Sequence, residues 1–378
     1  MDANLRCMNE SSEDHTAALT PPLTSMGRAS SASVRDGRPP SRRCPARYPS
    51  VMMARRVAAR LLGTCLLCIF WAADARSGDG RMNGFVLTPT SIPIDEVLHG
   101  GPQRDGIPAL DEPLMEPADT ARLDDQEWVI GVTWQGEARA YPLEILVWHE
   151  LVNDTIAGRP ILVSYCPLCG TGLVFDRPAG KPGSPGAEPE ADRFGVSGLI
   201  YRSDMLMYDR ATESLWSQIS ARSVTGPRTG ERLSLIRSEQ MRWADWQMLH
   251  PASRVMSRET GHRRPYGRSP YGDYALNRKL LFPLDQDRRY HPKMRTLGLR
   301  LASGLARAYP SEELLRLGAP LVEDFAGYSI RVSYDPESKR FQVSAPPEVE
   351  VLEAYWFAWA AFHPEASTFE APQHEAAN

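Results

Sequence analysis

The sequence lacks an excess of basic residues. Its 43 Lys and Arg stand against 47 Asp and Glu, which gives a formal net charge of -4. Proteins that bind nucleic acid use Lys and Arg to neutralise phosphates, so this balance gives no support to that class of function. We therefore predict no nucleic-acid partner, and the sequence does not identify a protein partner.

The sequence also lacks an apolar run long enough to span a membrane. The run at residues 61–73 is shorter than the ~20 residues that a transmembrane helix needs. Arg55 and Arg56 precede it, and Ala73 and Ala75 follow it at the spacing of a signal-peptidase site. We predict a cleaved signal and export to the periplasm or the exterior, with no transmembrane domain in the mature chain. An uncleaved signal would anchor the protein to the membrane.

Residues 1–51 have no apolar periodicity and are rich in Ser, Pro, Arg and Thr. Such a segment cannot bury enough surface to offset the entropy of ordering it, so we expect a disordered leader. A signal lies at an N-terminus, so we expect the translation start at Met52 or Met53, with the leader not translated.

Cysteine is scarce in the mature chain. Four of the six cysteines fall before residue 76, which leaves only Cys166 and Cys169. The mature protein is therefore not held together by a set of disulfides and must depend on its apolar core.

Two parts of the chain resemble one another in the same order, which predicts an internal duplication. Each part reads as a strand ending in Ala-Tyr-Pro, a short helix, a strand ending in Val-Ser-Tyr, a further strand, and a Trp-rich helix stopped by proline. The first part carries an insertion that includes a Pro/Gly-rich loop at 178–189. The matching segments are 137–142 with 305–310, 157–165 with 326–334, and 243–251 with 356–364.

This pattern predicts an α+β fold of mostly short antiparallel strands with a few helices, in two related lobes. The expected divisions are a leader at 1–51, a signal at 52–75, a linker at 76–90, a first lobe at 91–260, a connector at 261–293, a second lobe at 294–370 and a tail at 371–378.

The second lobe serves as a control for the first. Cys166 and Cys169 have Asp335 and Ser338 as counterparts, and His149 falls opposite Leu317 or Gly318. All three candidate metal ligands of the first lobe are thus missing from the second lobe, which indicates that they act as a unit. His250 persists as His363 and is therefore interpreted as structural.

The turn that carries Cys166 and Cys169 favours metal binding. A Cys-Pro-x-Cys-Gly turn between strands directs two sulfurs to one point, as in a zinc knuckle. His149, in the helix-like segment 146–154, is the best candidate to complete the site. Met205 and Met207 would add thioether ligands that suit copper, although alternating methionines also fill cores. The expected cofactor is a metal ion, copper or zinc.

Two other interpretations of the cysteines stay open. A disulfide across so short a loop would stabilise the fold by only ~2 kcal/mol. A redox pair usually has its first cysteine at a helix N-terminus, and Gly170 and Gly172 disfavour a helix there.

Longer motifs resemble a known family. These are Ala140-Tyr-Pro142, His149-Glu-x-Val-Asn-Asp154, Tyr165 to Thr171 and Tyr208 to Gln218. They closely resemble the family called domain of unknown function 3179, over roughly residues 92–370. The resemblance implies an exported, microbial context and no established reaction. It also marks a cluster of polar residues in the insertion, which could line a pocket beside the cysteines or could instead satisfy hydrogen bonds in local turns. The cluster consists of Ser203, Asp204, Asp209, Arg210, Ser217 and Gln218. Glu150 and Asn153, near His149, are further candidates for this pocket.

The sequence contains no Gly-x-Ser-x-Gly motif and no phosphate-binding glycine loop after a strand, so it identifies no catalytic residue. We predict an exported metal-binding protein or metalloenzyme. The alternatives are a periplasmic thiol-disulfide oxidoreductase, with Cys166 attacking and Cys169 resolving, and a noncatalytic interaction module.

Overall fold

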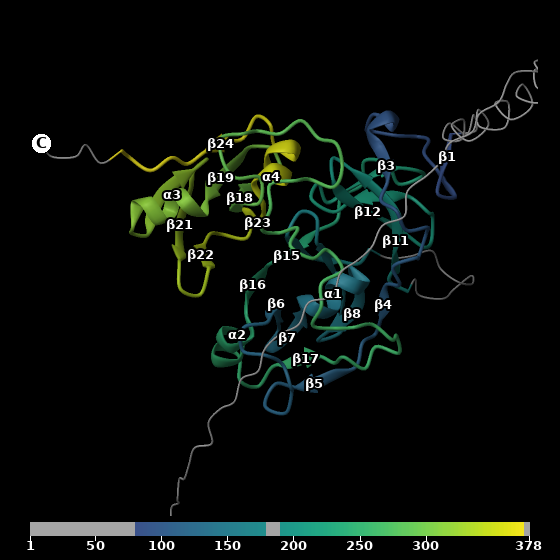
Figure 1. The fold of residues 1–378 in the computed structure, drawn as a ribbon, viewed down its shortest axis with the longest axis horizontal. Coiled ribbons are helices and arrows are strands. Elements are labelled where there is room, and N and C mark those ends of the chain that lie inside the picture. The colour runs from purple at the N-terminus through teal and green to yellow at the C-terminus, as the bar shows by residue number, and fades with distance from the viewer. Residues whose placement is uncertain (1–79, 179–189, 374–378) are drawn as a thin grey trace, which may run out of the picture. The chain divides into compact units, whose positions relative to one another are not determined.

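The computed structural model describes residues 80–178 and 190–373 (Figure 1). The predicted leader and signal, residues 76–79 of the predicted linker and residues 374–378 of the predicted tail lie outside this part of the chain. The Pro/Gly-rich loop also lies outside it, apart from residue 178. The predictions for these segments therefore stay predictions.

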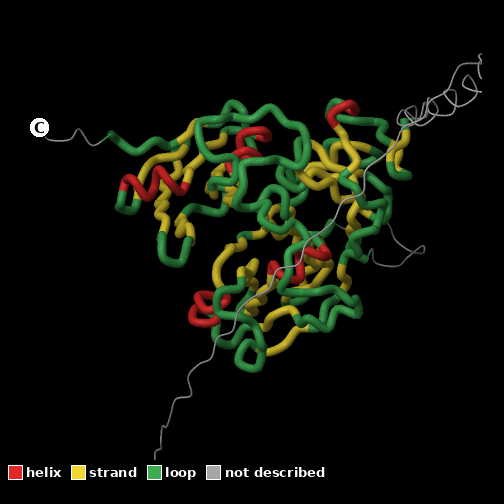
Figure 2. Tube along the Cα trace, viewed as in Figure 1, coloured by secondary structure: helices red, strands yellow, loops and turns green. Residues whose placement is uncertain are grey.

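The described chain is mostly β, with four short α-helices (Figure 2). The predicted short strands and few helices are present, but the term α+β overstates the helical part, because each helix has only seven residues. Pro142 and Pro310 directly precede the first and third helices, with φ near -60° as a helix start requires. The helices are α1 (Leu143–His149), α2 (Trp243–Leu249), α3 (Ser311–Leu317) and α4 (Trp356–Phe362).

Five sheets of three or more strands are arranged as a five-bladed β-propeller. In strand order they are β16-β6-β7-β17-β5, β15-β10-β9-β8-β4, β14-β13-β12-β11-β3, β23-β18-β19-β24 and β20-β21-β22, and β1 pairs with β2 apart from these. The bounds are β1 (Arg81–Met82), β2 (Phe85–Val86), β3 (Val97–His99), β4 (Leu110–Asp111), β5 (Met115–Pro117), β6 (Trp128–Trp134), β7 (Glu137–Pro142), β8 (Leu151–Ile156), β9 (Arg159–Cys166), β10 (Thr171–Asp176), β11 (Phe194–Tyr201), β12 (Asp204–Asp209), β13 (Leu215–Ser217), β14 (Arg222–Thr225), β15 (Leu235–Ile236), β16 (Ser238–Arg242), β17 (Arg254–Met256), β18 (Arg295–Arg300), β19 (Ala306–Pro310), β20 (Leu321–Phe325), β21 (Tyr328–Asp335), β22 (Arg340–Ser344), β23 (Glu350–Tyr355) and β24 (Ser367–Thr368).

Two of the sheets have the same strand order and the same parallel edge pair. In β16-β6-β7-β17 the last two strands are parallel, as they are in β23-β18-β19-β24. A glycine in the second strand of each sheet leaves room for a tryptophan of the helix that directly follows the first strand, which is α2 after β16 and α4 after β23. A Cβ on Gly131 would lie 2.0 Å from the Trp246 ring, and a Cβ on Gly298 would lie 1.8 Å from the Trp359 ring. Both tryptophans can pack only because these positions lack a side chain.

A tyrosine–arginine–carboxylate group also occurs in both halves, buried or partly buried. The Tyr141 hydroxyl donates to Asp154 (2.7 Å), which also pairs with Arg139. In the second half Arg307 pairs with Glu323, and the Tyr309 hydroxyl donates to the same carboxylate. Each group ties the Ala-Tyr-Pro strand to the strand after the helix.

The predicted insertion of the first half forms the sheet β14-β13-β12-β11, with β3 at its edge. All eight residues of β11 and all six of β12 are buried, so both faces of this hairpin are covered. One apolar cluster includes side chains from this sheet, from the cysteine hairpin and from β23 and α4. The insertion is therefore part of the core around the cysteines.

The predicted helix over 146–154 is wrong in its second half. Helix α1 ends at His149, and the chain becomes strand β8 at Leu151. Glu150 has a positive φ of 60°, which stops the helix. The residues that follow pair along β9, and these tertiary contacts decide their conformation.

Within residues 80–178 and 190–373, no helix has both the length and the apolar character needed to cross a bilayer.

Candidate functional site

Cys166 and Cys169 lie in a strand-to-strand turn, as the sequence predicts. Cys166 ends β9 and pairs with Thr171 at the start of β10. The turn includes Gly170 at φ 60°, where a Cβ would meet the Tyr355 ring at 2.7 Å. The Tyr355 amide donates to the Cys169 carbonyl oxygen (2.7 Å), so the second half of the chain fixes this turn from outside.

Both cysteines are free thiols, and both are buried. Their apolar neighbours come from three sheets. Burial disfavours a thiolate and raises the pKa of Cys169, and the nearby Cys166 and Asp204 raise it further. The metal-free thiol of Cys169 is therefore protonated at neutral pH.

The tip of the β11–β12 hairpin brings a carboxyl group to the cysteine turn. Arg202 and Ser203 both have positive φ, of 51° and 62°, as the two central residues of a tight hairpin turn require. This turn directs the Ser203 carbonyl oxygen at the Cys169 thiol, which donates to it (3.2 Å). Asp204 follows, and its Oδ1 lies 3.8 Å from the Cys169 sulfur.

Asp204 is held by its second oxygen. Oδ2 accepts hydrogen bonds from the Ser217 hydroxyl and from the Ile219 amide, each 3.1 Å long. Oδ1 therefore faces the thiols. The two sulfurs and one carboxylate oxygen of Asp204 lie within 4.8 Å of one another, in a fully buried group that could hold a metal ion.

Burial raises the pKa of Asp204 to about 7, although hydrogen bonds from Ile219, Ser217 and Cys169 act in the opposite direction. Desolvation of the anion thus outweighs these donors. A cation bound here would favour the ionised forms of Asp204 and Cys169, which burial disfavours.

Two further polar side chains support the site. The Gln218 amide nitrogen donates to the Ser164 hydroxyl and to the Thr171 carbonyl oxygen, both at 3.0 Å, which ties β13 to the cysteine hairpin. Among the described residues, the Ser203 hydroxyl and the Gln218 carbonyl oxygen are buried without a hydrogen-bond partner. Buried polar atoms of this kind are uncommon in proteins, and these two belong to residues that contact the cysteine hairpin.

His149 does not belong to the close group of ligand atoms, and its role in completing the site stays a prediction. Its Nδ1–H donates to the Pro108 carbonyl oxygen (2.8 Å), so Nε2 accepts from the Tyr266 hydroxyl (2.7 Å). Both ring nitrogens are thus engaged, and burial lowers the pKa of the ring to about 4. The end of α1 directs His149 to the connector instead of to the thiols.

Met205 and Met207 lie in β12, next to Asp204. Both are buried in the apolar cluster that contains the cysteines. This packing accounts for them as core residues, and their role as copper ligands stays a prediction.

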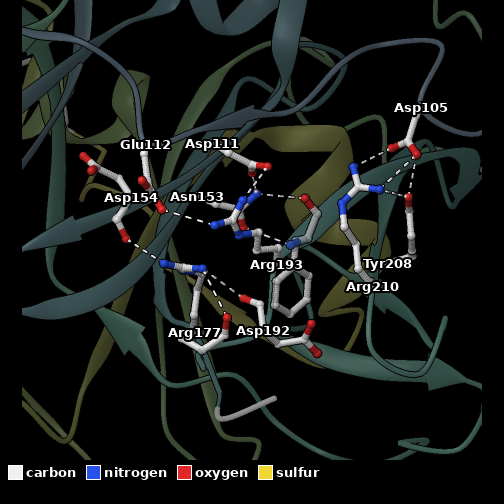
Figure 3. A network of polar contacts seen from close by, with 12 residues as sticks. Asp105, Asp111, Glu112, Asn153, Asp154, Arg177, Asp192, Arg193, Tyr208 and Arg210 are labelled. Carbon is white, nitrogen blue, oxygen red and sulfur yellow. Dashed lines mark hydrogen bonds and ion pairs between the residues drawn. The ribbon is translucent and has the colours of Figure 1, made fainter. Parts of the chain in front are cut away.

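Other candidates from the polar cluster hold the fold elsewhere. Figure 3 shows Asn153 bonded to Asp111 and Arg210 bonded to Asp105. Asn153 also exchanges two hydrogen bonds with the Phe194 backbone, which joins β8 to β11. Asp209 accepts from Thr212 in the turn that follows it and from the indole of Trp216 in β13. Of the predicted pocket residues, the structure gathers Ser203, Asp204, Ser217 and Gln218 at the thiols.

Glu150 lies on another side of the cysteines, in a cavity of about 320 Å³ that Cys166, Met205 and Tyr271 also line. The Tyr271 hydroxyl is 3.4 Å from Glu150 Oε1. Burial raises the pKa of Glu150 to about 7, and the nearby Asp204 raises it further. Only Cys166 of the two cysteines lines this cavity.

The sequence did not predict that Asp204 lies with the two thiols. Asp204 was predicted as a pocket residue and not as a ligand, because 35 positions separate it from Cys169. The available signal was its place in the insertion that the second half lacks, beside cysteines that the second half also lacks.

Fold and site together define a β-propeller with a buried cysteine–carboxylate group that could hold a metal ion. The chain belongs to the family described as protein of unknown function (DUF3179), whose model matches residues 104–347. This match confirms the family resemblance over a narrower range than the motifs suggested. The comparisons found no matching curated protein and no matching solved structure.

Proposed function

We propose that this protein is an exported metal-binding protein, with Cys166, Cys169 and Asp204 holding a zinc or copper ion. The single observation that carries the proposal is the close grouping of these three ligand atoms in a buried place. The three residues come from two different hairpins, so tertiary packing brings their ligand atoms together.

The donor set fits such an ion. Two thiolates and a carboxylate suit zinc, and thiolates also suit copper in its reduced state. Ligand thiols lose their protons on binding, so the metal would supply the charge compensation that this buried place lacks. Ser217 and Ile219 orient Asp204 from behind, as groups around a metal site commonly do for its ligands.

The site also supports an enzymatic role. Three protein ligands leave a fourth position open on a tetrahedral ion, as in catalytic zinc sites. Cys166 lines the cavity, which gives a small molecule access to that side of the group. We propose a metalloenzyme on this ground, in which the bound ion would polarise a substrate oxygen.

Metal analysis of protein purified in its native compartment tests the proposal. Wild type should hold one ion per chain, and Cys166→Ser, Cys169→Ser and Asp204→Asn should each lose it. His149→Asn should keep it, since both ring nitrogens have other partners. The matched control is Asp335→Asn with Ser338→Ala, in the corresponding turn of the second half. Metal at equal levels in Asp204→Asn and wild type would contradict the proposal.

A second candidate function is thiol-disulfide exchange. Cys166 lines the cavity, while Cys169 lies deeper, beside Asp204. The Cys166 thiolate would attack a substrate disulfide and release one substrate thiolate. Cys169, losing its proton to Asp204, would then attack Cys166 and release the second. The substrate disulfide is thereby reduced and Cys166–Cys169 oxidised. A reversible two-electron couple in metal-free wild type, absent from Cys169→Ser, would favour this candidate.

Export is proposed from the signal-like segment at 52–75. Cell fractionation and N-terminal sequencing of the mature protein test it. A mature N-terminus close to residue 76 in the periplasmic or secreted fraction is the expected result, and intact protein in the cytoplasm would oppose it.

We also propose that the two halves arose by duplication. The shared strand order, the glycine–tryptophan pairs and the Arg-Tyr-carboxylate groups support this proposal. The division into a first lobe, a connector and a second lobe follows from it.

A further inference from the structure

The cavity beside Cys166 has a closed inner end and an open outer end. Cys166, Glu150 and Met205 are buried and line its inner end, while Trp148 and Arg264 line it and are partly exposed. Most of the remaining lining is apolar or glycine. At about 320 Å³ the cavity is at the small end of ligand pockets, so it suits a small, mainly apolar molecule.

Arg264 brings a positive charge to the outer end. Within the described residues it has no ion pair or hydrogen bond of its side chain, and its ring contact is with Trp148, 5.8 Å away. Most arginines of the described chain pair with a carboxylate, among them Arg139, Arg258 and Arg300. An unpaired guanidinium at a pocket mouth favours an anionic group on the ligand, and a carboxylate matches its planar geometry.

Glu150 places a carboxyl group at the inner end of the cavity, although its own backbone is in an unfavourable conformation. Its φ and ψ are 60° and -35°, outside the ordinary left-handed region. The corresponding residue after α3 is Gly318, which adopts φ 67° and ψ 8°. A glycine would suit position 150 better, so the chain keeps this glutamate at a cost in backbone strain, which points to a role for its side chain in the cavity.

The wall of this cavity is tied down by three consecutive residues at the end of α1. The Trp148 indole donates to the Arg268 carbonyl oxygen (3.1 Å), His149 accepts from Tyr266, and Glu150 accepts from Tyr271. These bonds hold the connector segment 264–271 against the first half. The cavity is therefore formed before any ligand arrives, which lowers the entropy lost on binding.

We propose that this cavity binds a small carboxylate that has an apolar body and a polar group at its far end. Arg264 pairs with the carboxylate at the mouth, the apolar lining covers the body, and Glu150 hydrogen-bonds the far polar group next to Cys166. The inference deepens the proposed function, on which it rests, because it makes the far polar group the part of the substrate that meets the metal site.

Three probes with the same six-carbon chain test the ligand class by calorimetric titration of metal-loaded wild type. They are 6-hydroxyhexanoate, hexanoate without the far hydroxyl, and hexane-1,6-diol without the carboxylate. We expect 6-hydroxyhexanoate to bind most tightly, hexanoate about fivefold more weakly and the diol at least tenfold more weakly. Equal binding of all three, or no binding of any, would overturn the inference.

Variants assign each end of the ligand. Arg264→Gln should weaken both carboxylates about tenfold and leave the diol unchanged, whereas the exposed neighbour Arg263→Gln should change nothing. Glu150→Met should reduce 6-hydroxyhexanoate to the affinity of hexanoate. Val196→Trp, which fills the apolar wall, should abolish all binding. Thermal melting shows that each variant is folded. Unchanged carboxylate binding in folded Arg264→Gln or Val196→Trp would place the ligand elsewhere and overturn the inference.

Failure of this inference and failure of the metal site can be told apart. The same titrations are repeated on Asp204→Asn, and metal content is measured in Arg264→Gln. If a chain without metal still binds carboxylates through Arg264, the proposal for the cavity stands and the proposal for the metal site is contradicted. If the protein holds one metal ion per chain but binds no carboxylate, the proposal for the metal site stands and the proposal for the cavity is contradicted.

Discussion

The two corresponding turns, between β9 and β10 and between β21 and β22, have the same length and different chemistry. In both, the residues at the turn's first and fourth positions face each other: Cys166 with Cys169, and Asp335 with Ser338, whose hydroxyl donates to the carboxylate (2.6 Å). The first pair is buried and the second is partly exposed. The turn itself thus sets the geometry, and the covering sheet β14-β13-β12-β11 decides whether it becomes a buried site.

The largest expected effect concerns moving the cysteines. Asp335→Cys with Ser338→Cys, in a chain that carries Cys166→Ser and Cys169→Ser, should bind zinc at least 100-fold more weakly than wild type. In the part of the chain that the structure describes, the second half has no hairpin corresponding to β11–β12 that would bring a carboxylate to its turn and orient it. Competition with a zinc chelator measures the affinity. Equal affinity would show that the turn alone makes the site.

The next prediction tests the shared scaffold. Gly131→Ala and Gly298→Ala should each lower the free energy of unfolding by about 3 kcal/mol, because each new Cβ collides with a buried tryptophan ring. Urea unfolding of both variants measures this loss. Similar losses would support two equivalent halves, while a loss in only one half would break the comparison.

Glu150 should make stability depend on pH in the first half only. Its pKa is raised to about 7 by burial, with a contribution from Asp204, and Tyr271 opposes the shift. The native state therefore prefers the protonated form. The stabilisation is complete below about pH 4.5 and is lost as pH rises through 7, by about 3 kcal/mol in metal-free protein. Chemical unfolding across this range should be flatter for Glu150→Gln; identical slopes would contradict the assignment.

Substitutions at the two residues that end α1 and α3 should have smaller effects on stability, with opposite signs in the two halves. Glu150→Gly should stabilise the protein by about 1 kcal/mol, and Gly318→Ala should destabilise it by about as much, because both positions have positive φ. Thermal unfolding at pH 7 measures both. Destabilisation by Glu150→Gly would mean that the side chain supports the fold more than its backbone strains it.

The smallest effect concerns the tryptophans. The Trp246 indole donates to the Ser253 hydroxyl (3.0 Å), whereas the Trp359 indole nitrogen, opposite Ala366, has no partner among the described residues. Ser253→Ala should cost about 1 kcal/mol, and Ala366→Ser should stabilise by up to about 1 kcal/mol. Thermal unfolding measures both changes. No change in either variant would show that these helices do not depend on the indole bond.

Local patterns predicted much of the backbone. The strands that end in Ala-Tyr-Pro and Val-Ser-Tyr, the helices that follow a proline or open with tryptophan, and the turn at the two cysteines are present. These features depend on residues close in sequence, such as prolines that fix φ and a glycine that accepts a positive φ. The segment after His149 was misassigned because its pairing partners in β9 override its helix-like pattern.

The sequence by itself determined the family, the scarcity of cysteine and the turn that brings Cys166 next to Cys169, because each depends on local order along the chain. Only the tertiary structure decided the third member of the group, since the β11–β12 hairpin brings Asp204 to the thiols across 35 residues. It also directed His149 to the connector and not to the cysteines. Which side of a short helix faces which neighbour depends on packing, and packing is fixed by the whole chain.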